Sequence, residues 1–212
     1  MQSITKTLPR ALILDYGNVL SLPQPPEIVT AMAVRVGVSV EAFTAAYWEH
    51  RRGYDAGTYP ADEYWRRVLG SLGRAPERAE ERGLPGWLAE RDAASWMCYR
   101  DEVWTLAREA RGRDARTAML TNMSREIADR IRAHRPLDAW FDAVIVSAEV
   151  GLVKPDERIY ALCLARLDAA PPQALFVDDR PENVAAAARL GMRTVYFAGT
   201  DPVADLRAAL RR

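Results

Sequence analysis

The sequence has little cysteine and histidine and no excess of charge of either sign. Among 212 residues there are two cysteines and two histidines, and 29 basic residues balance 29 acidic ones. Cys98 and Cys163 are far apart and match no metal-binding spacing, so we expect two reduced thiols in the core. A chain of zero net charge lacks the basic surface that nucleic acids and anionic membranes attract. We therefore expect no nucleic-acid partner.

Long apolar runs are also missing. No stretch approaches the roughly 18–20 apolar residues of a membrane span, and the N-terminal MQSITKTLPR lacks the apolar segment of a signal peptide. We expect a cytoplasmic protein without a membrane partner, either a monomer or a homodimer. The hydrophobic share of 49% and the charged share of 27% are ordinary for a globular chain. This length suffices for one α/β domain, or for a core domain that carries an insertion.

Strands and helices alternate from about residue 115 onward. After an early strand at 11–14, we expect strands at 115–120, 142–147, 174–179 and 193–197, and helices at 124–133, 156–167, 181–192 and 201–212. Ser124 is a plausible N-cap of the first of these helices. The apolar run ALIL at 11–14 is typical of a strand that is buried on both faces. The alternation predicts an α/β fold with a parallel sheet and right-handed crossovers.

The segment from about residue 22 to 100 is helical instead. Its periodicity predicts helices at 27–38, 40–54, 61–73 and 86–97. Five of the six tryptophans lie in or just beyond it, and helix packing explains them most simply: Trp48, Trp65, Trp87, Trp96 and Trp104. We expect a core made of residues 1–21 and 101–212, with residues 22–100 inserted after the first strand as a helical cap above the strand ends.

Polar residues follow four of the expected strands. Asp15 comes after ALIL, Thr121–Asn122 after TAML, Lys154–Pro155 beyond AVIVS and a loop, and Asp178–Asp179 after ALFV. A lone acid at a strand end is usually a turn or helix cap. Four such features at matching places predict one site, because ligands of open α/β sheets bind outside the carboxyl ends of the strands.

The residue types in this group suit phosphoryl transfer. Three clustered carboxylates would repel one another and raise their pKa values, which a hard divalent cation such as Mg²⁺ relieves. In that arrangement the cation and Lys154 neutralise a phosphoryl group, Thr121 and Asn122 orient it, and one carboxylate attacks it. Such a transfer mainly needs positioning and charge stabilisation.

The order D…TN…KP…DD resembles the haloacid dehalogenase (HAD) superfamily, as do SAEVGLVKPDERIY and LFVDDRPENVAAAARLGM. The resemblance implies a Rossmann-like three-layer sandwich, a cap, and hydrolysis through an aspartyl-phosphate. By the same resemblance Asp15 is the nucleophile, Lys154 steadies the phosphoryl group, and Thr121 and Asn122 hold it. In the turn after Asp15, Asn18 is expected to offer its backbone N–H to the phosphate. Asp15, Asp178, Asp179 and the main-chain carbonyl of Gly17 are the implied Mg²⁺ ligands.

Gly17 departs from that family's pattern, because most HAD phosphatases carry a second aspartate there as general acid and base. One interpretation is a phosphatase for leaving groups that need less protonation. The motif D-x-G-N-V resembles a HAD subgroup similar to bacterial glucose-1-phosphate phosphatases and related to the N-terminal domain of soluble epoxide hydrolases. A second is a weakly active or inactive protein that binds a phosphorylated ligand or partner. A third is a 2-haloacid dehalogenase, against which the acid pair argues because dehalogenases of this superfamily use no metal.

The cap is expected to recognise the substrate, a small phosphorylated molecule such as a sugar phosphate. YWEHRRGYDAGTYPADEYW, at residues 47–65, combines aromatic and basic side chains. We expect Trp48, His50, Arg51 and Tyr54 to contact the substrate, while an amphipathic helix with solvated arginines remains the simpler alternative. Asn183 is expected to bond near the acid pair, although the polarity of a helix start explains it as well.

Overall fold

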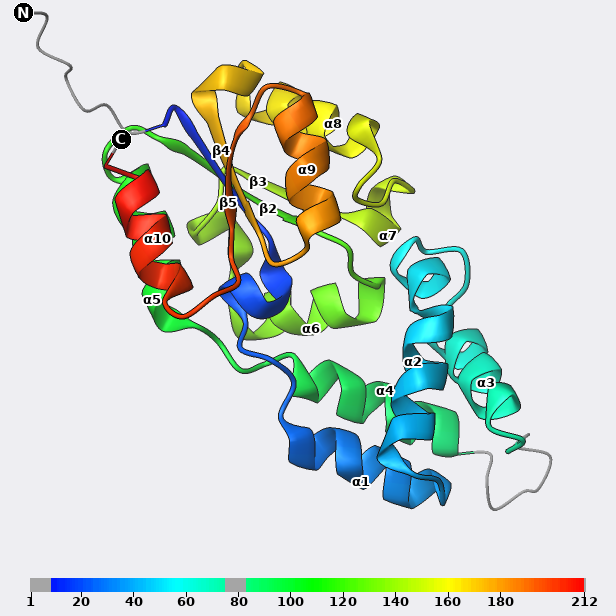
Figure 1. The fold of residues 1–212 in the computed structure, drawn as a ribbon. Coiled ribbons are helices and arrows are strands. Elements are labelled where there is room, and N and C mark those ends of the chain that lie inside the picture. The colour runs from blue at the N-terminus through cyan, green and yellow to red at the C-terminus, as the bar shows by residue number, and fades with distance from the viewer. Residues whose placement is uncertain (1–8, 75–82, 212) are drawn as a thin grey trace, which may run out of the picture.

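The core of the computed structural model, which describes residues 9–74 and 83–211, is a parallel sheet of five strands in the order β3-β2-β1-β4-β5 (Figure 1). The strands are β1 (Ala11–Leu14), β2 (Arg116–Thr121), β3 (Ala143–Val146), β4 (Ala174–Asp178) and β5 (Arg193–Tyr196). The central strand β1 places Ala11 opposite both Arg116 and Ala174. The carboxyl ends of β1, β2 and β4 therefore adjoin, and the predicted parallel α/β sheet is confirmed.

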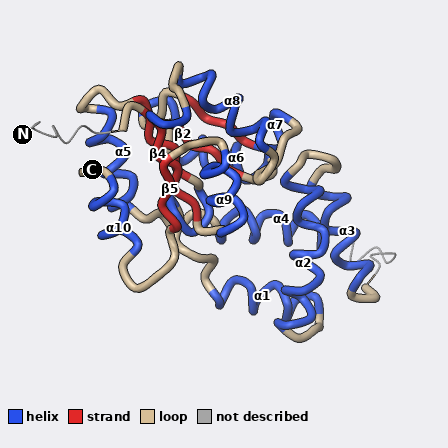
Figure 2. The backbone as a smooth tube through the Cα atoms, turned by 45° about the horizontal axis from the view of Figure 1, so that its top comes forward, coloured by secondary structure: helices blue, strands red, loops and turns tan. Residues whose placement is uncertain are grey.

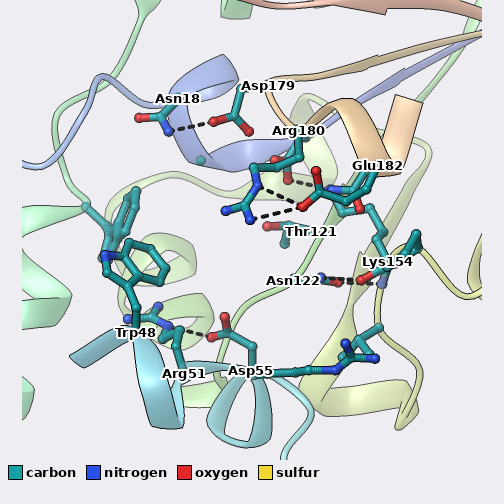
Figure 3. A pocket seen from close by; sticks show the side chains of 17 residues that line it. Asn18, Trp48, Arg51, Asp55, Thr121, Asn122, Lys154, Asp179, Arg180 and Glu182 are labelled. Carbon is teal, nitrogen blue, oxygen red and sulfur yellow. Dashed lines mark hydrogen bonds and ion pairs between the residues drawn. The ribbon is translucent and has the colours of Figure 1, made fainter. Parts of the chain in front are cut away.

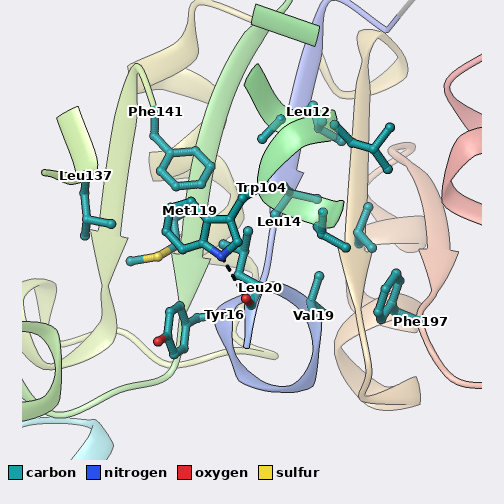
Figure 4. Packing of buried hydrophobic residues seen from close by; sticks show 14 of the residues in the cluster. Leu12, Leu14, Tyr16, Val19, Leu20, Trp104, Met119, Leu137, Phe141 and Phe197 are labelled. Carbon is teal, nitrogen blue, oxygen red and sulfur yellow. Dashed lines mark hydrogen bonds between the residues drawn. The ribbon is translucent and has the colours of Figure 1, made fainter. Parts of the chain in front are cut away.

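Helices cover both faces of the sheet. One face packs against α5 (Asp101–Arg111), α6 (Arg125–His134) and α10 (Pro202–Ala209), and the other against α8 (Glu157–Leu167) and α9 (Pro181–Arg189). Successive residues of a strand point to opposite faces, so Leu12 and Leu14 pack with Trp104 of α5 (Figure 4) while Ile13 packs toward α8 and α9. Figure 2 shows the sheet between these helices, and the three-layer sandwich is confirmed.

Four helices form a separate apolar cluster beside this sandwich: α1 (Pro26–Val36), α2 (Val40–Asp55), α3 (Ala61–Ser71) and α4 (Leu84–Ser95). Gly37 ends α1 in the left-handed conformation (φ 78°), and Ser39 then caps α2 by accepting from the backbone N–H of Ala42. Contacts of α4 with α6 and of α2 with α7 (Ser147–Val150) place these helices over the carboxyl ends of the strands. The boundaries of a cap at residues 22 and 100 stay a prediction.

The chain enters and leaves the four-helix cluster at one place. Ser21 and Tyr99 form an antiparallel bridge. On either side of it, the N–H of Leu22 donates to the carbonyl of Cys98 (2.7 Å) and the N–H of Arg100 to that of Leu20 (2.9 Å). The two crossings between the cluster and the sandwich therefore lie side by side.

Several elements differ from those expected. The helices α5 and α7 were not predicted, and α7 has only four residues, too few for a helical period to show in sequence. Strand β2 extends to Thr121, and the turn after Asp15 is a short π-type turn, η1 (Tyr16–Leu20). Ser124 stands at the N-cap of α6, but its side chain makes no capping hydrogen bond. Apart from α5, which has eleven residues, the differences concern element ends or short elements, where local patterns are weakest.

The two cysteines and the apolar character of the helices can be compared with what the sequence predicts. Cys163 is buried and Cys98 half-buried, and both are free thiols. Within residues 9–74 and 83–211, no single helix is long and apolar enough to cross a membrane. The pair α1 and α2 reaches that length and composition only together, with a bend of 96° between them.

Candidate active site

Three carboxylates meet where β1 and β4 end. Asp15 directly follows β1, Asp178 is the last residue of β4, and Asp179 comes next, so the parallel pairing of the two strands brings them together. One oxygen from each lies within 4.8 Å of the others. Asp178 is fully buried and Asp15 is 7% exposed. Because carboxylate oxygens are the donors that hard divalent cations prefer, this group fits Mg²⁺.

Lys154 joins two of these carboxylates from the loop before α8. Its Nζ lies 2.8 Å from Oδ1 of Asp15 and 2.6 Å from Oδ2 of Asp178, and its side chain is buried. Burial by itself would lower the pKa of Lys154, but the two carboxylates outweigh it and hold that pKa above the ordinary value. Lys154 is therefore a fixed positive charge beside Asp15.

Asp15 and Asp179 are protonated more easily than ordinary aspartates. Burial is the main cause that raises the pKa of Asp15 to about 7, while Lys154 opposes the rise and Asp178 adds to it. Burial also raises the pKa of Asp179, against the hydrogen bond that Asn18 donates to it. The three carboxylates thus carry more negative charge than one lysine neutralises, and a bound cation would relieve this.

Neighbouring groups hold Asp178 in place. Its Oδ1 accepts from the backbone N–H of Arg180 at 2.8 Å, and both its oxygens accept from Nδ2 of Asn183 at 3.0 and 3.1 Å. The predicted bond of Asn183 near the acid pair is therefore confirmed. Together with Lys154, these donors leave Asp178 fixed in one orientation, as a preorganised charged site requires.

Two asparagines that were expected to contact phosphate have other partners. The side chain of Asn122 donates to the carbonyl of Lys154 (2.9 Å) and accepts from its N–H (2.8 Å), so it anchors the backbone that carries Lys154. Asn18 uses its side chain on Asp179 (2.7 Å) and its N–H on Oγ of Ser21 (3.2 Å). These bonds position the charged residues, and the expected contacts of Asn18 and Asn122 with phosphate stay predictions. Thr121 is buried and borders the cleft as expected.

A cleft of about 620 Å³ opens above these residues, between the carboxyl edge of the sheet and helix α2 (Figure 3). Its lining consists of Asp15, Gly17, Asn18, Trp48, Arg51, Arg52, Asp55, Trp96, Thr121, Asn122, Val153, Lys154, Pro155, Asp179, Arg180, Glu182 and Asn183. All the site residues predicted in the sandwich except Asp178 line the cleft, and α2 faces them across it.

Only some of the cap residues predicted to contact substrate border this cleft. Trp48 and Arg51 do, and Trp48 is 48% exposed. His50 and Tyr54 are not among the residues that line it: Nε2 of His50 lies 2.8 Å from Oγ of Ser71, and Tyr54 is buried against the ring of Tyr64, so their contact with substrate stays a prediction. The sequence of a helix rich in aromatic and basic residues does not reveal which of its faces a neighbouring helix covers.

Arg51 is itself mostly committed to a buried network. Its Nε donates to Asp55 (2.8 Å) and its guanidinium also pairs with Asp92 of α4 at 3.2 Å. Burial is the main cause that raises the pKa of Asp55 to about 6, although Arg51 opposes the rise. Arg51 thus ties α2 to α4, and the interpretation as a solvated arginine is wrong for it, whereas Arg52 is exposed at the cleft.

Several residues that line the cleft were not predicted as site residues, among them Asp55, Trp96 and Arg180. Asp55 ends α2 and borders the cleft from the cap side, and its position just before a Gly-containing turn was the available signal. Arg180 follows the acid pair directly and could have been included for that reason. Nothing in the sequence assigned Trp96 to the cleft, because helix packing explains a single tryptophan equally well.

Comparisons with known proteins identify the family. The family described as haloacid dehalogenase-like hydrolase matches residues 9–191. The chain is 30% identical to acyl-CoA dehydrogenase family member 10 of Mus musculus over 88% of this chain, and 34% identical to a phosphoserine phosphatase of Thermus thermophilus over 64%. It spans only 18% and 53% of the lengths of these two relatives. Sesquiterpene phosphatase astK of Aspergillus oryzae is 29% identical, and the match covers 92% of both chains.

Solved structures share the fold. A HAD-like family hydrolase from Porphyromonas gingivalis superimposes with a TM-score of 0.74 at 23% identity, over 97% of this chain and all of that one. A HAD family enzyme of Bacteroides thetaiotaomicron, in complex with magnesium and inorganic phosphate, superimposes with a TM-score of 0.66 at 16% identity, over 87% and 91% of the two chains. The family match spans most of the sequence and agrees with the fold and with the order of the strand-end residues, so the chain belongs to the haloacid dehalogenase-like hydrolases.

Proposed function

We propose that this protein is a Mg²⁺-dependent phosphomonoesterase that acts on a small phosphorylated metabolite. The observation that carries the proposal is the bridge of Lys154 between Asp15 and Asp178, inside a cluster of three carboxylates at the end of a cleft. It sets a carboxylate nucleophile beside a fixed positive charge, which phosphoryl transfer requires. The phosphatase relatives from Thermus and Aspergillus support the same reaction class.

The reaction has two displacements at phosphorus. A carboxylate oxygen of Asp15 forms a bond to phosphorus while the bond from phosphorus to the alcohol oxygen breaks, and the departing alkoxide takes a proton from solvent. Water then attacks the aspartyl-phosphate, which releases inorganic phosphate and a proton and restores the Asp15 carboxylate. Lys154 compensates the charge on the phosphoryl oxygens in both steps, and Asn122 keeps its backbone in position.

Asp15, Asp178 and Asp179 would hold the cation, with the carbonyl of Gly17 as the fourth protein ligand that the family resemblance implies. A Mg²⁺ ion bound there would neutralise the phosphoryl oxygens and lower the repulsion between them and the incoming carboxylate. Asp178 already accepts four hydrogen bonds, counting that from Lys154, so its part is mainly to fix the charge of the site. Asp15 and Asp179 lie nearer to the cleft, which both of them border.

Phosphate release should require the divalent cation. We expect inorganic phosphate from at least one ester in a panel of sugar phosphates, nucleotides and aryl phosphates when Mg²⁺ is present, and a fall to background with a chelator. The physical reason is that the negative charges of substrate and carboxylates then repel one another without compensation. Equal rates with Mg²⁺ and with chelator would contradict the metal dependence. If no ester released phosphate, the alternative of an inactive protein that binds phosphorylated ligands would be favoured.

Gly17→Asp should change the dependence on the leaving group. The glycine has φ −59° and ψ 127°, which any residue adopts, and an added Cβ would lie 3.7 Å from Trp96, an ordinary contact. The new carboxyl could protonate the departing alcohol, and general acid catalysis is typically worth about 10²–10⁴-fold. We expect kcat/KM to rise for ethyl phosphate relative to phenyl phosphate.

The matched control is Gly70→Asp, because an added Cβ at this exposed position of α3 meets no atom within 4 Å. It should leave the ratio of the two kcat/KM values as it is in the unmodified protein. If Gly17→Asp also left that ratio unchanged, the missing acid would not be what limits hydrolysis of alkyl esters.

A further inference from the structure

A second chamber, of about 390 Å³, lies beside the active-site cleft and has a different chemical character. The two share Asn18, Trp48, Trp96 and Arg180 in their linings, so they adjoin at the two indole rings. Helices α1 and α2 and the segment before α1 supply the walls of the chamber, whose apolar members are Pro23, Pro26, Val29, Met32, Val40 and Phe43.

Several polar side chains in this lining are already paired inside the protein, and Thr30 and Thr44 add two hydroxyl groups. The hydroxyl of Tyr47 donates to Asp92 (2.8 Å), and Nε2 of Gln24 donates to Oγ of Ser95 (2.7 Å) and to Asp92 (3.2 Å). Arg180, at the shared boundary, is the one charged residue of the lining among the residues that the structure describes, and it pairs with Glu182 at 3.0 Å. A sugar would bury hydroxyls here with few partners, which costs free energy, whereas an apolar group gains from leaving water.

Gly17 helps to keep the two spaces in contact. It borders the cleft next to Asp15, and Trp96 stands 3.7 Å from where its Cβ would be. A larger side chain at residue 17 would point toward the indole that separates the cleft from the chamber. The glycine that removes the family's usual acid thus also leaves space beside the nucleophile on the side of the chamber.

We propose that the chamber holds the leaving group of the substrate, and that this leaving group is apolar: a phosphomonoester of a hydrocarbon alcohol or phenol, with its phosphate at Asp15 and its hydrocarbon part between α1 and α2. The inference rests on the proposed phosphatase function and specifies its substrate class. It replaces the sugar phosphate expected from the sequence, which was to bond to His50 or Arg51. The side chains of these residues are paired with Ser71, Asp55 and Asp92.

The test compares two aryl esters with chemically similar phenol leaving groups, phenyl phosphate and 1-naphthyl phosphate, in the presence of Mg²⁺. The second differs mainly by one further apolar ring. We expect kcat/KM to be about tenfold higher for the naphthyl ester, the size of effect that a small hydrophobic increment gives in a fitted pocket. Glycerol 3-phosphate and glucose 1-phosphate, whose leaving groups are polar, should be poorer substrates than either.

The variant Val40→Asp places a charge on the chamber wall. Val40 is the first residue of α2 and 36% exposed, and an acid is favourable in the first turn of a helix, so the fold should be kept. We expect the naphthyl-to-phenyl ratio to fall toward one. The control is Val34→Asp on α1, which is 71% exposed and does not border the chamber; there the ratio should stay as in the unmodified protein.

The outcomes separate this inference from the proposed function. Phosphate release with a ratio of one or less, or with sugar phosphates preferred, would overturn the apolar chamber and leave the phosphatase standing. Release from no ester would overturn the phosphatase. In that case, calorimetric titration of the unmodified protein decides on the chamber: tighter binding of 1-naphthyl than of phenyl phosphate, lost in Val40→Asp, supports it, and equal or absent binding overturns it.

Discussion

Replacement of Asp15 by asparagine should lower the rate of phosphate release by about 10⁴–10⁶-fold, the range seen when the nucleophile of a covalent mechanism is removed. The carboxamide has nearly the same shape as the carboxylate but does not form the aspartyl-phosphate. The fold should persist, because the backbone N–H of Asp15 still donates to the carbonyl of Val177 (2.9 Å). The measurement is phosphate release under saturating Mg²⁺, with circular dichroism to verify the fold.

Asp168→Asn is the matched control for this experiment. Asp168 ends α8 with a side chain that is 94% exposed in its ion pair with Arg10, and its φ of 49° is a conformation that asparagine tolerates well. It should keep the rate of the unmodified protein. If Asp15→Asn kept a rate within tenfold of that value while Asp168→Asn did the same, Asp15 would not be the nucleophile.

The second large effect is expected from Lys154→Met, in stability as well as in activity. Lys154 is one of only two lysines in the chain, and its Nζ contacts both Asp15 and Asp178. Methionine fills a similar volume but leaves two buried carboxylates without their cation. Removing one partner of a buried ion pair typically costs about 3–5 kcal/mol of unfolding free energy. Loss of the charge beside the phosphoryl group should also slow turnover by about 10²–10³-fold.

Urea denaturation in chelator and in Mg²⁺ measures the first of these effects. The loss of stability should be largest in chelator and smaller with Mg²⁺, because a cation bound by the same carboxylates replaces part of the missing charge. Arg66→Met is the control: it breaks an exposed pair with Asp62 on α3, and such pairs are worth about 0.3–0.5 kcal/mol. A loss no larger than that of the control would show that Lys154 does not stabilise the buried carboxylates.

The core of the site was predictable because the relevant information is local. One apolar run is followed by Asp15, and another by Asp178 and Asp179. Each run predicts a strand and places these acids at its carboxyl end. Parallel pairing of strands then brings the ends together without further information. The sequence also carries Lys154 next to Pro155, in a loop whose place after the third strand of the sandwich could be counted along the chain.

The cap side was less predictable because it depends on which helix faces pack together. His50, Arg51 and Tyr54 lie within two turns of α2, yet one contacts α3, one pairs with α4 and one is stacked in the apolar cluster. Asp55 at the end of α2 and Trp96 after α4 border the same cleft, and the buried ion pairs of Arg51 join these two helices. Such contacts between distant segments leave no periodic trace in a single sequence.

The paired crossings at Ser21 and Tyr99 have a consequence for how such a protein can change over evolutionary time. Because the chain leaves the sandwich and returns to it at adjacent points, the ends of the inserted segment already lie together, the geometry that tolerates insertion and exchange of a whole segment. The acid cluster and its lysine belong to the sandwich, whereas most of the chamber walls come from α1, α2 and the segment before α1. Substitutions between Ser21 and Tyr99 can therefore change the selectivity for a leaving group, while the residues proposed for phosphoryl transfer remain under separate selection.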